Sequence, residues 1–184
     1  MSAVIQSLNQ PVIAHISGSV EADATYFEQH YAARIQKACE DGHSFVIGPS
    51  RGIDTLAFNF LRDCLVSPAR ITVYLNHKEA PRLRHQFKSF EIEGGNVIVI
   101  SGGHTERDEA MTRASHYDIL RYRTEVECRT LYGPSYKTRI SGTEKNELRR
   151  KTGIGLSWTE PVDVVPPLPK AVDLDCYGKP ESTV

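Results

Sequence analysis

The segment SFVIGPSRGID, residues 44–54, runs from a short apolar stretch through a glycine-containing loop into the first turn of a predicted helix. Residues 45–47 are aromatic or β-branched, which favours a strand. Apolar residues from Leu56 to Leu65 then recur at helical spacing. A strand, a glycine loop and a helix in this order form the repeating unit of α/β proteins.

The same alternation of apolar patterns recurs along the chain. The predicted strands cover residues 11–17, 44–48, 71–75, 96–100 and 117–122, and the predicted helices cover residues 22–40, 56–65, 106–115 and 143–151. Because strands alternate with helices, right-handed crossovers would place the strands in parallel. We therefore predict the fold class α/β, with a Rossmann-like open, mostly parallel sheet of about five strands flanked by helices.

The predicted strand over residues 96–100, Asn-Val-Ile-Val-Ile, shows no alternation of polar and apolar residues. Central strands of a parallel sheet are covered by helices on both faces, and their side chains are apolar on both. We therefore expect this strand to be buried.

Length and composition favour one domain. The chain has 184 residues and a formal net charge of -1. We predict a single Rossmann-like domain over residues 1–158 and a C-terminal arm over residues 159–184 that contains five prolines. A nearly neutral chain has no overall field that would attract duplex nucleic acid or an anionic membrane.

Three further patterns predict a cytoplasmic protein without a membrane partner. No apolar run approaches the roughly 18 residues that a membrane-spanning helix needs. The first six residues, Met-Ser-Ala-Val-Ile-Gln, do not resemble the start of a signal peptide. The four cysteines form no C-x-x-C pair, which favours free thiols in a reducing compartment.

Three glycine-containing loops follow predicted strands, over residues 17–19, 48–52 and 101–104. The carboxyl ends of parallel strands meet at one edge of a sheet, where ligands bind. Glycine allows close approach of a ligand to the backbone, and free amides at a helix start suit a phosphate. The ligand-binding candidates are Gly18, Ser19, Gly48, Ser50, Arg51, Gly52, Asp54, Gly102, Gly103 and Arg107.

Charged residues near these loops allow two interpretations. Arg51 and Arg107 could pair with a phosphate, and Asp54 or Asp108 could hold a ribose hydroxyl. The alternative is that Arg51 is solvated and that each aspartate only stabilises the start of its helix.

Carboxylates around the predicted fifth strand are candidates for catalysis. Asp118 begins this strand, and Glu125 and Glu127 follow it. We take Glu125, Glu127 and Asp108 as catalytic candidates, because a carboxylate in such a cleft could stabilise positive charge at a glycosidic bond or act as its nucleophile. The alternative is that they are solvated loop charges.

Several common site motifs are missing from the sequence. The chain has no H-E-x-x-H or cysteine–histidine cluster, no G-x-x-x-x-G-K-[ST] and no full G-x-G-x-x-G. We therefore predict no metal site and no cofactor.

Residues 12–120 resemble the SLOG superfamily of Rossmann-like domains, which includes Lonely Guy phosphoribohydrolases, DNA-processing protein A and YspA-like domains. The resemblance rests on Gly18-Ser19 after the first strand, on residues 48–57 with their Arg-Gly-Ile-Asp core, and on Arg107-Asp108-x-x-Met111. It implies a nucleotide ligand bound by the candidate residues above, and a homo-oligomer.

The chain departs from the Lonely Guy pattern at one segment. Those enzymes carry Pro-Gly-Gly-x-Gly-Thr-x-x-Glu after a later strand, where this chain has residues 121–127, Arg-Tyr-Arg-Thr-Glu-Val-Glu. One hypothesis is therefore a protein that binds a nucleoside monophosphate and hydrolyses or transfers at its N-glycosidic bond. A second is a non-catalytic sensor of a nucleotide-derived signal, and a third is a binder of single-stranded nucleic acid.

Overall fold

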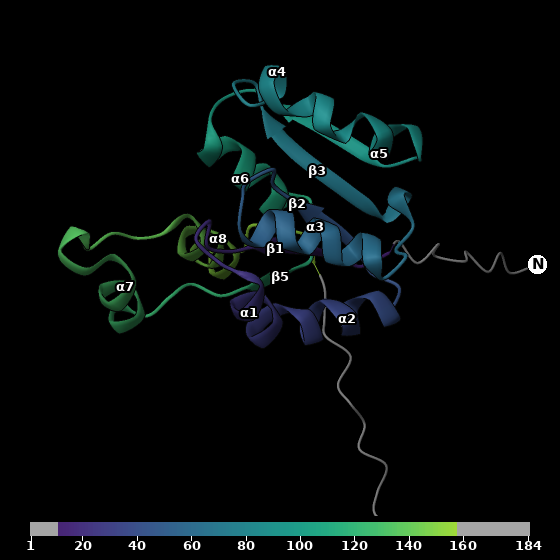
Figure 1. Ribbon diagram of the computed structural model, residues 1–184. Helices are drawn as coiled ribbons and strands as arrows, with labels where there is room; N and C mark the ends of the chain where they lie inside the picture. Colours follow the sequence, from purple (N-terminus) through teal and green to yellow (C-terminus); the bar gives the residue numbers. More distant parts are fainter. Residues whose placement is uncertain (1–10, 158–184) are drawn as a thin grey trace, which may run out of the picture.

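A five-stranded parallel sheet forms the centre of the molecule (Figure 1). The computed structural model describes residues 11–157. The strand order is β4-β3-β2-β1-β5. The strands are β1 (Ile13–Ser17), β2 (Ser44–Ile47), β3 (Ile71–Asn76), β4 (Asn96–Ile100) and β5 (Tyr117–Leu120). The predicted α/β class and the open parallel sheet of five strands are confirmed.

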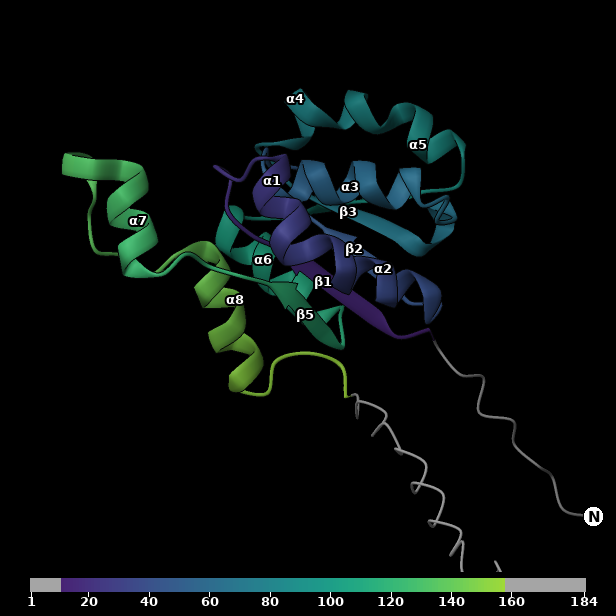
Figure 2. The same cartoon turned by 60° about the horizontal axis from the view of Figure 1, so that its bottom comes forward.

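Helices cover both faces of the sheet (Figure 2). The first face carries α1, α2, α3 and α5, and the second carries α6 and α8. One π-helical turn, Glu28–Ala32, joins α1 to α2. The helices are α1 (Ala24–Phe27), α2 (Ala33–Glu40), α3 (Ile53–Asp63), α4 (Ala80–Leu83), α5 (Lys88–Ile92), α6 (His104–Arg113), α7 (Glu125–Tyr132) and α8 (Gly142–Lys151).

The side chains of β1 alternate between two different environments. Ala14 and Ile16 are fully buried in the main apolar core under α1, α2 and α3. His15 and Ser17 point to the opposite face and are also buried. The second face of the sheet therefore contains polar groups close to the centre of the molecule.

The position of β4 contradicts one expectation from the sequence. We expected residues 96–100 to be buried, but within residues 11–157 β4 is an edge strand that pairs only with β3. Ile98 and Val99, on opposite faces of this strand, are each 39% exposed. The expectation was wrong because an unbroken apolar run does not reveal whether a strand has one neighbour or two.

Helix α7 was not predicted, and it projects from the side of the molecule (Figures 1 and 2). Thr124 accepts a hydrogen bond from the Glu127 amide, and Glu127 accepts one from the Thr124 amide. This reciprocal capping box is visible in the sequence as Thr-x-x-Glu.

Two further predictions from the sequence concern the C-terminal arm and membrane-spanning helices. The predicted arm, residues 159–184, lies outside the described residues. Within residues 11–157, no helix is long and apolar enough to cross a membrane.

Candidate functional site

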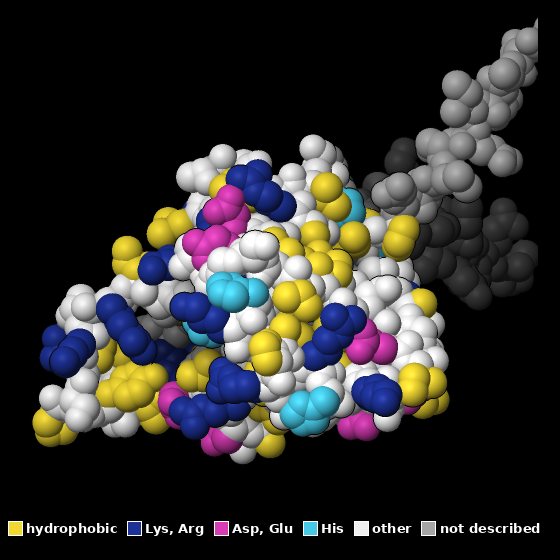
Figure 3. Space-filling model, turned by 90° about the horizontal axis from the view of Figure 1, so that it is seen from above, with side chains coloured by type: hydrophobic (Ala, Val, Ile, Leu, Met, Phe, Trp, Pro, Cys, Tyr) yellow, Lys and Arg dark blue, Asp and Glu magenta, His cyan; other side chains and the backbone are white. Residues whose placement is uncertain are grey.

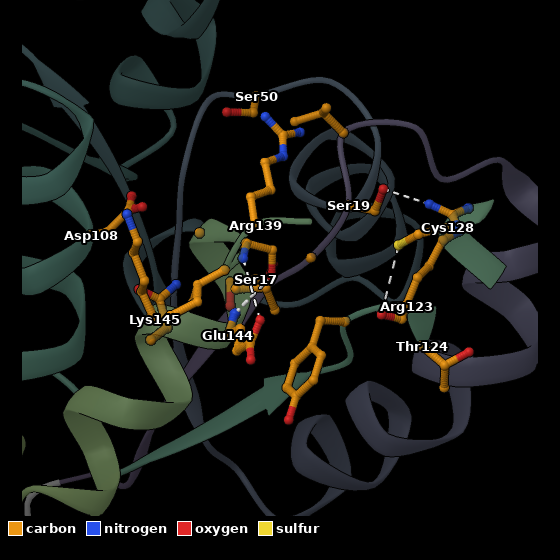
Figure 4. Close-up of a pocket in the computed structure, with 18 of the residues that line it drawn as sticks. Ser17, Ser19, Ser50, Asp108, Arg123, Thr124, Cys128, Arg139, Glu144 and Lys145 are labelled. Atoms are coloured by element: carbon orange, nitrogen blue, oxygen red, sulfur yellow. Dashed lines mark hydrogen bonds between the residues drawn. The ribbon is translucent and has the colours of Figure 1, made fainter. Parts of the chain in front are cut away.

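The strand order creates a crevice between β1 and β5. The chain passes from β1 outward through β2 and β3 to β4, and then returns to β5 on the other side of β1. The loops after β1 and β5 therefore diverge, which is the usual place for a ligand in an open α/β sheet. A cavity of about 970 Å3 opens there, between this edge of the sheet and the segment that carries α7 and α8 (Figure 4).

Ser17, at the end of β1, contributes a buried hydroxyl to this cleft. The residue is 7% exposed. Its Oγ has no hydrogen-bond partner among the residues that the structure describes. A buried polar group is normally hydrogen-bonded, so this hydroxyl is suited to a partner that the protein itself does not supply.

Asp54 is a buried carboxylate at the start of α3 that also lines the cleft. Its Oδ2 accepts a hydrogen bond of 3.1 Å from the Ser50 amide. Burial raises the pKa of Asp54 to about 6, although the Arg107 guanidinium and the Ser50 amide both favour the ionised form. Asp54 can therefore carry a proton under mildly acidic conditions, as general acids in enzymes do.

Arg107 is buried in an ionic network rather than free to bind a phosphate. Its Nη1 donates to Glu79 Oε1 at 2.6 Å, and its Nη2 donates to Asp108 Oδ1 at 2.8 Å. Glu79 is itself fixed, because its Oε2 accepts the Asn76 amide. Arg107 and Asp108 both line the cleft, and Arg107 holds Asp108 in place. Glu79 was not among the sequence candidates.

Four other cations line the cleft: Arg123, Lys137, Arg139 and Lys145. Within residues 11–157, none of them forms an ion pair with a carboxylate. Lys and Arg side chains gather around a gap on the side where α7 projects (Figure 3). Since the whole chain has a net charge of -1, this positive charge is a local feature.

These cations point at different parts of the cleft wall (Figure 4). Arg123 Nη1 donates to Ser19 Oγ at 2.6 Å, and its guanidinium lies 4.4 Å from the centroid of the Tyr26 ring. Arg139 points toward Ser50, and Lys145 points toward Asp108. The sequence candidates did not include these four cations. Arg123, Lys137 and Arg139 lie outside the predicted strands and helices, and Lys145 lies in the predicted helix over residues 143–151.

Helix α8 has its amino end at the cleft and is held on the sheet by a partly buried ion pair. Gly142 and Ser141, at this end, line the cleft. Arg150 Nε donates to Asp118 Oδ2 at 2.8 Å, and Asp118 Oδ1 lies 3.1 Å from His15 Nδ1. Desolvation opposes ionisation of Asp118, but the hydrogen bonds from His15 and Arg150 outweigh it and lower its pKa. Asp118 is therefore a structural anion beneath the cleft.

Seven of the residues predicted from the sequence line this cleft. They are Gly18, Ser19, Ser50, Asp54, Arg107, Asp108 and Glu125. The other six do not line it: Gly48, Arg51, Gly52, Gly102, Gly103 and Glu127.

Arg51 points away from the cleft. Its side chain is 75% exposed and pairs with Glu21 at 2.8 Å. Gly52 has a φ of +74°, and a Cβ there would collide with the Ser19 carbonyl oxygen. This glycine therefore allows the loop after β1 to pack on the start of α3, and its role is in packing.

Gly102 and Gly103 follow β4, at the edge of the sheet remote from β5. The Gly103 amide donates to Glu106 Oε2 at 2.7 Å, at the start of α6. The loop after β4 is therefore separated from the crevice, because β3 and β2 lie between β4 and β1.

The two glutamates of α7 have different surroundings. Arg121 hydrogen-bonds Glu127 at 2.6 Å, and this bond with the Thr124 amide lowers the pKa of Glu127 to about 2. Glu125 lines the cleft but pairs with Arg129, one turn along α7, at 2.7 Å. Glu127 therefore stays ionised and caps α7. Among the described residues that line the cleft, Glu125 is the only carboxylate from α7.

No protein-family model matches this chain, and no curated protein or solved structure matches it either. The functional assignment therefore depends on the geometry of the cleft.

Proposed function

We propose that this cleft binds a nucleotide and that the phosphate lies beside Ser17, Ser19 and Arg123. The main support is a buried hydroxyl without a partner in the described part of the chain, Ser17 Oγ, in a cleft lined by cations without carboxylate partners. A hydroxyl and a guanidinium are both donors, and a phosphate offers several acceptor oxygens. The cleft also lies where α/β folds bind ligands.

The same cleft offers aromatic surface for a base. Tyr122, Tyr132 and Tyr136 line it on the side of α7. Planar bases stack on aromatic rings without strong preference for one base. A phosphate beside β1 and a base toward α7 would use both the charged and the apolar parts of the cleft.

A second candidate function is hydrolysis of the N-glycosidic bond of the bound nucleotide. The raised pKa of Asp54 favours this reaction. Carboxylates with different surroundings can take different roles in acid–base chemistry, and Asp108 and Glu125 lie in the same cleft in surroundings that differ from those of Asp54. In this reaction a carboxylate stabilises the positive charge at the ribose carbon, an acid protonates the leaving base, and water adds to the sugar. A sensor would bind the same ligand without this step.

Calorimetry with a panel of nucleoside monophosphates tests the binding proposal. Ser17→Ala removes a hydroxyl that has no partner in the described chain, so the fold should be retained. A hydrogen bond to a charged group contributes roughly 1.5–3 kcal/mol, so affinity should fall about ten-fold or more. Ser89→Ala, at an exposed position on α5, is the control and should bind normally. If neither these monophosphates nor any nucleotide with more phosphates binds, the proposal is overturned.

Chromatographic detection of free base in the same samples separates the two candidates. Base release that is lost in Asp54→Asn would support a nucleotide hydrolase. Binding without release from any nucleotide would support a sensor.

Self-association and a cytoplasmic location also stand as proposals. The exposed edge of β4, with Ile98 and Val99, offers an unpaired strand to a second copy of the chain. Such an edge favours pairing unless it is covered.

A further inference from the structure

The cations of the cleft are spread over separate walls. Arg123 comes from the segment between β5 and α7 and contacts Ser19. Arg139 comes from the segment between α7 and α8, and its guanidinium points toward Ser50, away from the contact between Arg123 and Ser19 (Figure 4). Lys137 also belongs to that segment and lines the cleft. Lys137 and Arg139 thus form a second wall of the cleft. A single phosphate beside β1 would leave these two cations without an anion.

The other charges of the cleft do not neutralise this second wall. Arg107 takes up both Glu79 and Asp108. Lys145 points toward Asp108 (Figure 4), and Glu125 pairs with Arg129, which does not line the cleft. Glu144, the remaining carboxylate among the described lining residues apart from the buried Asp54, accepts the Ser141 amide in the capping box of α8. Within the described residues, Lys137 and Arg139 have no carboxylate partner. Cations that face the same cavity repel each other, and an anion bound between them offsets this repulsion.

The size of the cleft allows a ligand with more than one anionic group. Its volume of about 970 Å3 lies near the upper end of roughly 300–1,000 Å3, which is usual for small-molecule pockets. A guanidinium binds a phosphate through two parallel hydrogen bonds, so Arg139 is the cation best suited to hold a second phosphate. The Ser50 side chain, which lines the cleft on that side, can add a hydroxyl donor.

We infer that the ligand carries two phosphate groups, one beside Ser17, Ser19 and Arg123 and the second beside Arg139 and Ser50. The ligand class is thus a nucleoside diphosphate or a nucleoside bisphosphate, rather than a monophosphate. This inference rests on the proposed nucleotide-binding function and makes it narrower. It adds a specificity determinant, Arg139, which none of the sequence patterns indicated.

Calorimetry with AMP, ADP and adenosine 3′,5′-bisphosphate tests this inference in the full-length protein, with the corresponding guanosine compounds run in parallel. We expect at least one two-phosphate ligand to bind about ten-fold more tightly than the monophosphate of the same base, the effect of one added charge-assisted contact. Arg139 is exposed, so Arg139→Gln should not disturb the fold. This variant should lose the advantage of the second phosphate and keep its affinity for the monophosphate.

Arg113→Gln is a matched control, because Arg113 is an exposed arginine that pairs with Glu109 on α6 and does not line the cleft. It removes the same charge and should keep the ten-fold advantage. A preference for the diphosphate indicates adjacent phosphates, and a preference for the bisphosphate indicates separated ones; either result supports the inference.

Three outcomes would contradict it. Equal affinity for one and two phosphates in the wild type would overturn the inference but leave the nucleotide proposal standing. Equal losses for all ligands in Arg139→Gln would assign Arg139 to the first phosphate and also overturn it. Absence of any nucleotide binding would overturn both, and tight binding of a single-stranded oligonucleotide alone would replace them.

Discussion

Replacement of Asp54 by asparagine tests whether ionisation of this buried carboxylate lowers the free energy of unfolding. Asp54 is buried at the start of α3, and its pKa is about 6 rather than the ordinary 3.8. Because the folded protein holds this proton more tightly than the unfolded chain, the free energy of unfolding should fall as the pH rises from about 4 through 6. Asparagine has no charge, and its side-chain oxygen can still accept the Ser50 amide.

The magnitude follows from the difference between the two pKa values of Asp54. A shift of one unit corresponds to about 1.4 kcal/mol, so the shift from 3.8 to about 6 corresponds to about 3 kcal/mol over the full pH range. Between pH 4 and 7.5 we expect about 2 kcal/mol of this to be seen. The stability of Asp54→Asn, minus that of the wild type, should therefore increase by about 2 kcal/mol over this range.

Urea unfolding of both proteins at several pH values measures this difference. Other titrating groups contribute equally to both proteins and cancel in the subtraction. Asp63→Asn, at an exposed position on the same helix, is the control, and its difference from the wild type should stay within about 0.5 kcal/mol. A stability difference for Asp54→Asn that does not change with pH would refute the reasoning.

Three further predictions concern the glycine of the α3 loop, the buried anion and the sheet edge. Gly52→Ala should cost at least about 2 kcal/mol more in urea unfolding than Gly42→Ala, because both glycines have positive φ but only a Cβ at residue 52 meets backbone; equal costs would contradict this. Asp118→Asn should cost about 2 kcal/mol at pH 7 and less at pH 3, because a lowered pKa contributes stability that is lost as the pH falls; a cost independent of pH would exclude this explanation. In light scattering after gel filtration, the wild type should be a dimer and Ile98→Lys a monomer, whereas Val126→Lys on α7 should stay dimeric; a monomeric wild type would argue against pairing through β4.

Local sequence patterns were sufficient for the fold class. The runs around residues 13–17, 44–47 and 71–76 are strands, and glycine-containing loops follow the first two. These patterns depend on neighbours a few residues apart, and strands alternating with helices favour a parallel sheet. The loops after β1 and β2 were therefore correct indications of where a cleft would open.

The order of the strands could not be read in this way. The run Val-Ile-Val-Ile of β4 has the composition of a central strand, yet the tertiary structure leaves it at an edge. Strand order depends on pairing between segments far apart in the chain, for example β1 with β5. For the same reason, Gly102 and Gly103 could not be separated from the glycines that lie near the cleft.

The sequence by itself determined the residues of the cleft floor: the Gly18-Ser19 loop after β1, Ser50 after β2, and Asp54 in the first turn of α3. Only the tertiary structure decided the electrostatics. It buries Asp54, pairs Arg107 with Glu79, and brings Arg123 and Arg139 to the cleft from segments more than 60 residues further along the chain. Charge interactions and desolvation depend on distances through space, and those distances exist only once the chain has folded.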